Sequence, residues 1–181
     1  MAKVCIFLAD GFEEVEGLTV VDLLRRAGEE VVMVSVTGSM NLTGAHGIGI
    51  RADALFEEAD CEEADMLVLP GGMPGTLHLA EHKGLGELLK KADAEGKKLA
   101  AICAAPGVLG GLGLLKGKRA TCYPGCEENL KGAEIFTDPV VRDGNITTSR
   151  GVGTAILFAL ELIAQLEGEV KARTIKKSIV S

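Results

Sequence analysis

The 181-residue sequence predicts an α/β fold in which helices cover both faces of a mostly parallel sheet. Short, continuous apolar runs alternate along the chain with longer segments whose apolar residues recur at helical spacing. Because the runs lack polar/apolar alternation, the strands are expected to be buried on both faces. With 47% hydrophobic residues and 24 glycines, the composition is that of a globular chain rich in tight turns.

The expected elements follow in chain order. The first apolar run, KVCIFLA at 3–9, ends before Asp10-Gly11 and predicts a buried strand. Residues 14–27 carry apolar side chains at helical spacing, and Gly28 is the expected helix stop. The remaining expected elements are a strand at 30–36, a hairpin-like excursion at 38–55, a strand at 65–72, a helix at 85–95, a strand at 98–103, a short helix at 106–115, strand segments at 119–123 and 140–149, and a long helix at 152–166.

The bulk properties limit the organisation and the partners. The length suits one domain over residues 1–181, and the chain has no repeat or linker-like segment. A formal net charge of −7 argues against specific nucleic-acid binding and against an anionic membrane surface. The first apolar run is too short for a secretory signal, and no run is long enough to cross a bilayer. An odd number of cysteines without a signal predicts reduced thiols in the cytoplasm; they are Cys5, Cys61, Cys103, Cys122 and Cys126.

The order of elements also brings three segments to one edge of the sheet. Binding sites in such sheets lie beyond the carboxyl ends of the strands. Asp10, the Gly71-Gly72 pair and Cys103 each follow an expected strand. We therefore expect these residues to share one crevice.

Cys103 has two interpretations. A free cysteine is commonly a buried packing residue. At a strand-to-helix turn, with Pro106 in the first helical turn, the amides of Ala104 and Ala105 and the helix N-terminus would instead stabilise a thiolate. The position in the expected sheet favours this second interpretation, a nucleophile on a sharp turn with a lowered pKa.

Three carboxylates follow the first strand in DGFEEVEG (10–17). Glu13 and Glu14 are explained by the favourable interaction of acidic residues with a helix N-terminus. Glu16 lies among Val15, Gly17 and the apolar residues of the helix, so its side chain could turn inward. A buried carboxyl beside a thiolate would have a raised pKa and could donate a hydrogen bond to the sulfur.

Glycines and possible metal ligands complete the candidates. The segment LPGGMPG (69–75) is either a flexible connection or a place where backbone amides approach a substrate oxygen as an oxyanion hole. His46, His78 and His82 are expected to be surface histidines. Cys122 and Cys126 have no second Cys/His pair at ligand spacing, so neither a metal site nor a cofactor is expected.

Five segments in order resemble a known family: LADGFEEVE, VDLLRRAG, LVLPGG, AICAAP and TTSRGVGTAILFALELI. Over nearly its whole length the chain is similar to the ThiJ/PfpI superfamily, in the branch of the parkinsonism-associated human protein and its bacterial relatives. This resemblance implies a flavodoxin-like three-layer sandwich, a nucleophile elbow and a homodimer.

The same resemblance assigns roles to single residues. It implies a reactive nucleophile at Cys103, a glutamate that tunes its pKa and shuttles protons at Glu16, and oxyanion-type amides at Gly71, Gly72 and Ala104. It implies glyoxalase activity (methylglyoxal to lactate), deglycase activity on glycated groups, and oxidative-stress sensing through a cysteine sulfinate. Relatives in other branches are described as intracellular peptidases or chaperones.

Two departures from related patterns narrow these functions. Peptidase-like relatives have a histidine directly after the cysteine, where this chain has Ala104, and some members of the branch have a histidine where this chain has Tyr123. Tyr123 supplies a hydroxyl to the pocket or serves in packing. A conventional Cys-His hydrolase is therefore disfavoured.

Three functions follow, in decreasing order of preference. The first is a stress-protective enzyme acting on small reactive carbonyls, in which Cys103 attacks an aldehyde and Glu16 moves a proton between carbons. The second is a non-enzymatic redox sensor or chaperone that uses oxidation of the same cysteine. The third is a cysteine peptidase.

Overall fold

The apolar runs form the strands of one main sheet in the computed structural model, which describes residues 1–181. These strands are β1 (Lys3–Leu8), β2 (Glu30–Ser35), β5 (Ala54–Leu55), β6 (Met66–Leu69), β7 (Lys98–Ile102), β10 (Val140–Asp143) and β11 (Ile146–Ser149). They are arranged in the order β10-β11-β7-β6-β1-β2-β5. All neighbours are parallel except β10, which is antiparallel to β11. The predicted α/β class with a mostly parallel sheet is confirmed.

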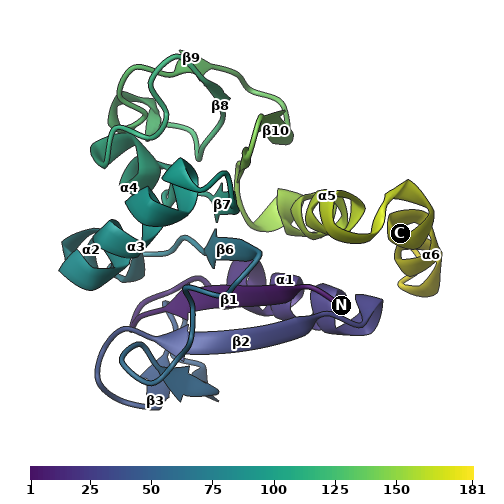
Figure 1. Cartoon of the computed structure of the whole chain (residues 1–181), viewed down its shortest axis with the longest axis horizontal. Helices are drawn as coiled ribbons and strands as arrows, with labels where there is room; N and C mark the ends of the chain where they lie inside the picture. The colour runs from purple at the N-terminus through teal and green to yellow at the C-terminus, as the bar shows by residue number, and fades with distance from the viewer.

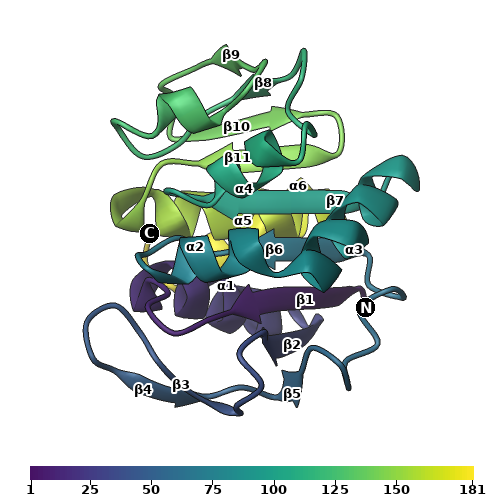
Figure 2. The same cartoon turned by 90° about the vertical axis from the view of Figure 1, so that its left-hand side faces the viewer.

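Helices cover both faces of this sheet and make it the middle of three layers. They are α1 (Glu14–Ala27), α2 (Gly75–Glu81), α3 (Lys83–Ala94), α4 (Pro106–Gly111), α5 (Ala155–Glu167) and α6 (Glu169–Ser178). Figure 2 shows α2, α3 and α4 in front of the sheet and α1, α5 and α6 behind it, and Figure 1 places α2, α3 and α4 at the left and α5 and α6 at the right. None of these helices has the combination of length and apolar character needed to cross a membrane.

Each face of the sheet has its own core, which explains the continuous apolar runs. In β1 the side chains of Val4, Ile6 and Leu8 belong to one buried cluster, and those of Cys5 and Phe7 belong to the other. Successive side chains of a strand point to opposite faces. A central strand covered by helices on both sides must therefore be apolar at every position.

Helix α1 begins and ends as its sequence predicts. Glu13 is the N-cap, and its side chain accepts a hydrogen bond from the amide of Val15 at 3.4 Å. Gly28 closes the helix in the left-handed conformation at φ +95°, which glycine adopts without steric cost. This helix matters for function because its first turn lies directly after the carboxyl end of β1.

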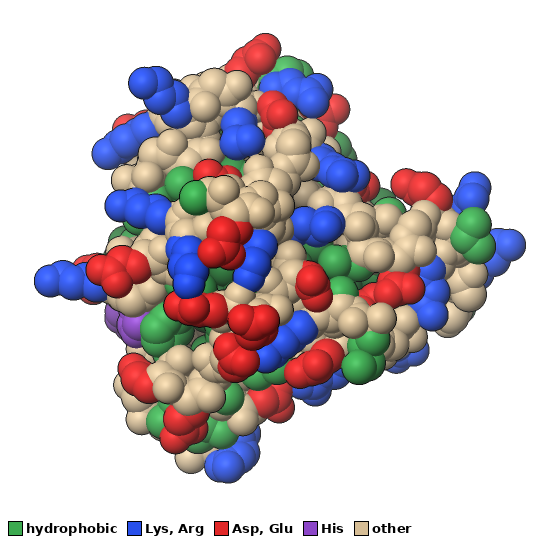
Figure 3. Space-filling view, viewed as in Figure 1, with side chains coloured by type: hydrophobic (Ala, Val, Ile, Leu, Met, Phe, Trp, Pro, Cys, Tyr) green, Lys and Arg blue, Asp and Glu red, His purple; other side chains and the backbone are tan.

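Four short strands lie outside the main sheet. The excursion at 38–55 contains an antiparallel pair, β3 (Asn41–Thr43) and β4 (Gly49–Arg51), as expected of a hairpin. A second small sheet pairs β8 (Arg119–Ala120) with β9 (Glu134–Ile135) in parallel. Two short 3₁₀ helices occur at Glu127–Asn129 and Val152–Thr154. Lys/Arg and Asp/Glu side chains are interspersed on the face shown in Figure 3, without a patch of one sign.

Several element boundaries differ from the prediction. Strand β6 stops at Leu69, the strand expected over 119–123 is only two residues long, and helix α4 stops at Gly111. A helix over 75–81 precedes the expected one, and the helix over 169–178 was not predicted. This last helix buries only Ala172 and Ile175, and half of its ten residues are charged, so no apolar segment marks it in the sequence.

Candidate active site

Three strands deliver the candidate residues to one edge of the sheet. Strands β1, β6 and β7 are neighbours and parallel, so their carboxyl ends lie side by side. The segments that follow them line an open cavity of about 850 Å³. Its wall is formed by Glu13, Val15, Glu16, His46, Gly72, Cys103, Tyr123, Pro124, Arg150, Gly151, Val152, Gly153 and Thr154. Asp10, expected in the same crevice, lies outside this wall, and its carboxylate accepts a hydrogen bond from the amide of Thr43 at 2.8 Å.

Cys103 is the residue directly after β7 and has an unusual backbone conformation. Its φ of +66° is in the left-handed region, which a residue with a Cβ adopts at a cost of about 1–3 kcal/mol. Two hydrogen bonds hold this conformation: the Cys103 amide donates to the carbonyl of Ser149 at 3.0 Å, and its carbonyl accepts from the amide of Tyr123 at 2.9 Å. The turn thereby aims a half-buried sulfur into the cavity instead of into the core.

Glu16 points inward from the first turn of α1, as its neighbours suggested. The residue is only 1% exposed. Its Oε2 accepts a hydrogen bond from the Gly71 amide at 2.9 Å, while Oε1 is buried without an N–H or O–H partner. A Cβ at position 71 would lie 2.6 Å from Cys103 Cβ and 2.7 Å from Glu16 Oε2. Glycine is therefore required at position 71 for the carboxyl and the thiol to approach each other.

Burial raises the pKa values of both members of this pair. The pKa of Glu16 is raised to about 7 by burial, although hydrogen bonds from the Cys103 thiol and the Gly71 amide oppose the change. The pKa of Cys103 is raised to about 12 by burial, by the negative charge of Glu16 and by the hydrogen bond to its carboxylate, in that order. The lowered cysteine pKa predicted from the sequence is thus wrong for a thiol beside an ionised Glu16.

Protonation of Glu16 removes the charge repulsion on the sulfur and reverses the direction of the hydrogen bond between the two groups. A neutral carboxyl exerts no charge repulsion on the sulfur, and its O–H can donate to a thiolate instead of accepting from a thiol. The two groups then titrate as a coupled pair with a single shared proton. The proton on Glu16 therefore decides whether this carboxyl group opposes or favours the thiolate.

Two backbone amides also reach the sulfur. The amides of Ala104 and Gly72 donate toward Cys103 and oppose the rise of its pKa. Gly72 has φ +93°, and a Cβ there would collide with the backbone of Glu13 and Gly11. Of the three expected oxyanion amides, those of Gly72 and Ala104 thus face the sulfur, whereas that of Gly71 is bound to Glu16.

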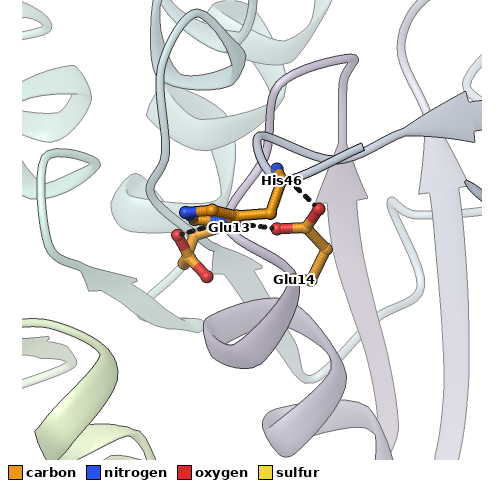
Figure 4. A group of neighbouring side chains, drawn as sticks. All are labelled: Glu13, Glu14 and His46. Atoms are coloured by element: carbon orange, nitrogen blue, oxygen red, sulfur yellow. Dashed lines mark hydrogen bonds and ion pairs between the residues drawn. The ribbon is translucent and has the colours of Figure 1, made fainter. Parts of the chain in front are cut away.

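Glu13, Glu14 and His46 form a second polar group beside the cavity (Figure 4). Glu14 is 3% exposed, and its Oε1 accepts hydrogen bonds from the amides of His46 at 2.8 Å and Ile48 at 3.3 Å. The His46 Nδ1 lies 3.0 Å from Glu14 Oε2 and 3.4 Å from Glu13 Oε2. The hydrogen bond to Glu14 and the charge of Glu13 raise the pKa of His46. Glu14 therefore does more than complement the helix dipole, because it fastens the 44–48 loop to α1.

Some of the remaining polar residues line the cavity, and others lie outside it. Tyr123, half exposed, and Arg150 line the cavity. His82 lies outside it and caps α3, where its Nδ1 accepts from the amide of Leu85 at 3.0 Å. Sequence reasoning missed Arg150 and the place of His46 in the wall. Arg150 could have been found, because it directly follows β11 and so obeys the same strand-end rule as Cys103.

Comparisons with known proteins agree with this architecture. The oxidized DJ-1 of Toxoplasma gondii superposes with a TM-score of 0.94 at 36% identity, over 99% of this chain and 98% of that one. A deglycase of Pyrococcus abyssi is 38% identical over 168 residues, which are 91% of this chain and 99% of the relative. The DJ-1 homolog B of Arabidopsis thaliana is 40% identical over 98% of this chain, which spans only 41% of that relative's length. A model of the DJ-1/PfpI family matches residues 2–165, and the chain therefore belongs to the DJ-1/PfpI family.

Proposed function

We propose that the chain is a cysteine-dependent enzyme of the glyoxalase or deglycase type that acts on small reactive carbonyls. One observation carries the proposal: a strained cysteine, a buried carboxyl with a pKa near 7 and two backbone amides meet in one open cavity. These are the nucleophile, the proton-transfer group and the oxyanion donors that carbonyl chemistry requires. The deglycase name of the Pyrococcus relative supports the same class.

The first steps would form a covalent adduct. With Glu16 protonated, the Cys103 thiolate attacks the aldehyde carbon of a 2-oxoaldehyde, and a C–S bond forms while the carbonyl electrons move to oxygen. The amides of Gly72 and Ala104, which already face the sulfur, stabilise this oxyanion. Glu16 then gives its proton to the oxygen, which leaves a hemithioacetal and a carboxylate.

The following steps would move hydrogen between the two carbons. The Glu16 carboxylate removes the proton from the former aldehyde carbon and returns it to the neighbouring carbon through an enediol, whose hydroxyl proton passes to the second oxygen. The result is a thioester of a 2-hydroxy acid. Water attacks the thioester carbonyl while the Glu16 carboxylate takes one of its protons, and the C–S bond then breaks. The products are a 2-hydroxy acid, the restored Cys103 thiolate and protonated Glu16. No external oxidant or reductant is consumed.

Turnover of methylglyoxal to lactate tests this proposal. The wild type should form lactate, and Cys103→Ser should not. Cys126→Ser is the matched control, because Cys126 is also a half-buried free cysteine but lies outside the cavity wall. Equal turnover by wild type and Cys103→Ser would overturn the proposal.

Oxidation of Cys103 is a second candidate function. The cavity exposes the sulfur, and a protonated Glu16 could donate to a sulfinate oxygen. The oxidized state named for the Toxoplasma structure supports this alternative for a relative. A chain that forms a stable Cys103 sulfinate under peroxide, but gives no lactate from methylglyoxal, would favour the sensor over the enzyme.

We further propose that two copies of the chain associate as a homodimer. Apolar side chains on α1, on the 3₁₀ helix Val152–Thr154 and on α5 remain more than two-fifths exposed: Val15, Val152, Ile156 and Leu157. Exposed apolar groups near one another are typical of an interface. Light scattering at micromolar concentration should give twice the chain mass, and a monomer mass would contradict the proposal.

A further inference from the structure

Arg150 is a cation in the wall of the cavity without a carboxylate partner. It is the first residue after β11 and lies at the same carboxyl edge of the sheet as Cys103. Its Nε donates to the carbonyl of Cys122 at 3.1 Å, which fixes the half-buried side chain. The two terminal nitrogens, Nη1 and Nη2, take part in no hydrogen bond or ion pair.

The other arginines of the chain differ from Arg150, because they either pair with carboxylates or, like Arg51 and Arg173, are exposed on the surface. Arg25 lies 2.6 Å from Asp53, and Arg26 lies 2.7 Å from Asp22. Arg142 lies 3.7 Å from Glu161. These ion pairs are on the surface, whereas the guanidinium of Arg150 lines a cavity and keeps its donors available.

The other charged groups in the cavity wall are Glu13, Glu16 and His46. None of them pairs with the guanidinium of Arg150, so its positive charge is available to a ligand. His46 is held by Glu13 and Glu14, and burial favours the neutral form of Glu16. One unpaired guanidinium suits a single carboxylate, because a doubly charged phosphate would leave a negative charge facing the acidic part of the wall.

We propose that Arg150 recognises a carboxylate on the substrate, so that the cavity prefers aldehydes that carry a carboxylate over neutral aldehydes. The guanidinium fork would hold the carboxylate while the aldehyde end reaches Cys103. This inference rests on the proposed function and makes Arg150 a specificity-determining residue. A carboxylate product would be held by the same contact.

Alkylation of Cys103 tests the inference without any turnover. Iodoacetate and 3-iodopropanoate are each compared with their neutral amides, and the rate ratio of acid to amide is measured at Cys103 by peptide mapping. A change in the reactivity of the thiol affects both reagents equally and cancels in the ratio. The ratio therefore reports recognition of the carboxylate alone.

Arg150→Gln should lower this ratio by about tenfold for at least one of the two acids. Arg150→Lys keeps the charge but loses the fork, and should give an intermediate ratio. Arg142→Gln removes a half-exposed arginine that lies outside the cavity wall, and should leave the ratio unchanged. Equal ratios in the wild type and in both Arg150 variants would overturn the inference.

Turnover then separates this inference from the proposed function. 4,5-Dioxopentanoate is a 2-oxoaldehyde that also carries a carboxylate, and methylglyoxal is a 2-oxoaldehyde without one. If both are consumed, Arg150→Gln should raise KM for 4,5-dioxopentanoate about tenfold and change that for methylglyoxal less than threefold. If neither is consumed while the alkylation ratio still depends on Arg150, the proposed enzyme fails and carboxylate recognition stands.

Discussion

Two places in the main sheet set a thiol against a second titratable side chain, and only one of them has the features of an active site. Cys103 interacts with Glu16 beyond the end of β7, whereas Cys5 interacts with Cys61 in the middle of β1. The hydrogen bond from Cys61 lowers the pKa of Cys5, and the same bond together with burial raises that of Cys61. Cys5 is fully buried, and its neighbours across the sheet are Val32 and Leu67.

The two places differ in whether backbone amides are free to donate hydrogen bonds to the sulfur. In the middle of a strand, amides are used by the neighbouring strands, and the side chain packs into a core. Beyond the end of β7 the chain turns, so the amides of Ala104 and Gly72 can point at the sulfur. A lowered thiol pKa alone therefore does not identify a reactive site, because Cys5 has one and faces no cavity.

The largest effects should come from replacing each of these two cysteines by alanine in turn. Cys103→Ala should lower carbonyl turnover by at least about a thousandfold and change stability little, because the half-buried thiol lines an open cavity. Cys5→Ala should retain turnover and lower the free energy of unfolding by about 1–2 kcal/mol, because it leaves a small cavity in the core. Steady-state kinetics and urea denaturation measure both quantities. If Cys5→Ala lost turnover while remaining fully folded, Cys5 would take part in the reaction and would not be a core residue alone.

Substitution of Gly71 tests how closely Cys103 and Glu16 must approach each other. Gly71→Ala places a methyl group 2.6 Å from Cys103 Cβ and 2.7 Å from Glu16 Oε2, and should reduce turnover by about a hundredfold through misplacement of both groups. Gly111→Ala is the matched control, since a Cβ there meets nothing within 4 Å. The control should keep full turnover and gain up to about 0.5 kcal/mol of stability. Similar turnover in the two variants would show that the close approach is unnecessary.

The burial of Glu16 should also appear in the dependence of stability on pH. In a Cys103→Ala background the thiol does not contribute. With Cys103 present, burial raises the pKa of native Glu16 to about 7, whereas the unfolded carboxyl loses its proton near 4.5. Removing the thiol also removes a hydrogen bond that lowers this pKa, so native Glu16 keeps its proton at least as far in the variant. The stabilisation is complete below pH 4.5, decreases as pH rises and is lost above about pH 7, with a total of up to about 3 kcal/mol.

Thermal unfolding across this pH range measures that loss. Adding Glu16→Gln to the same background should remove the decrease, because Gln does not titrate. A single-variant curve that is as flat as the double-variant curve would mean that Glu16 is ionised in the folded protein.

The sequence was sufficient where neighbouring residues determine the structure. The bounds of α1 follow from its apolar spacing and from Gly28, and the position of Cys103 follows from the order of strands and helices. The pairing of Glu14 with His46 depends on a loop 32 residues away, and the fixing of Arg150 depends on a carbonyl 28 residues away. Such contacts leave no periodic signal in the sequence. The raised pKa of Cys103 beside an ionised Glu16 was not predicted, because the effects of burial and of the Glu16 charge require the folded geometry.

The claim that Glu16 activates Cys103 by keeping its proton is tested most directly by titrating the thiolate absorbance. Wild type, Glu16→Gln and Glu16→Leu are compared, with Glu13→Gln as a control at the N-cap. Because Leu cannot donate to the thiolate, Glu16→Leu should raise the pKa of the Cys103 thiol by about 1 to 2 relative to the wild type. Glu16→Gln, which can still donate, should raise it less, and Glu13→Gln should change it little. An unchanged or lowered thiol pKa in Glu16→Leu would contradict the account, because it would mean that Glu16 is ionised and suppresses the thiolate.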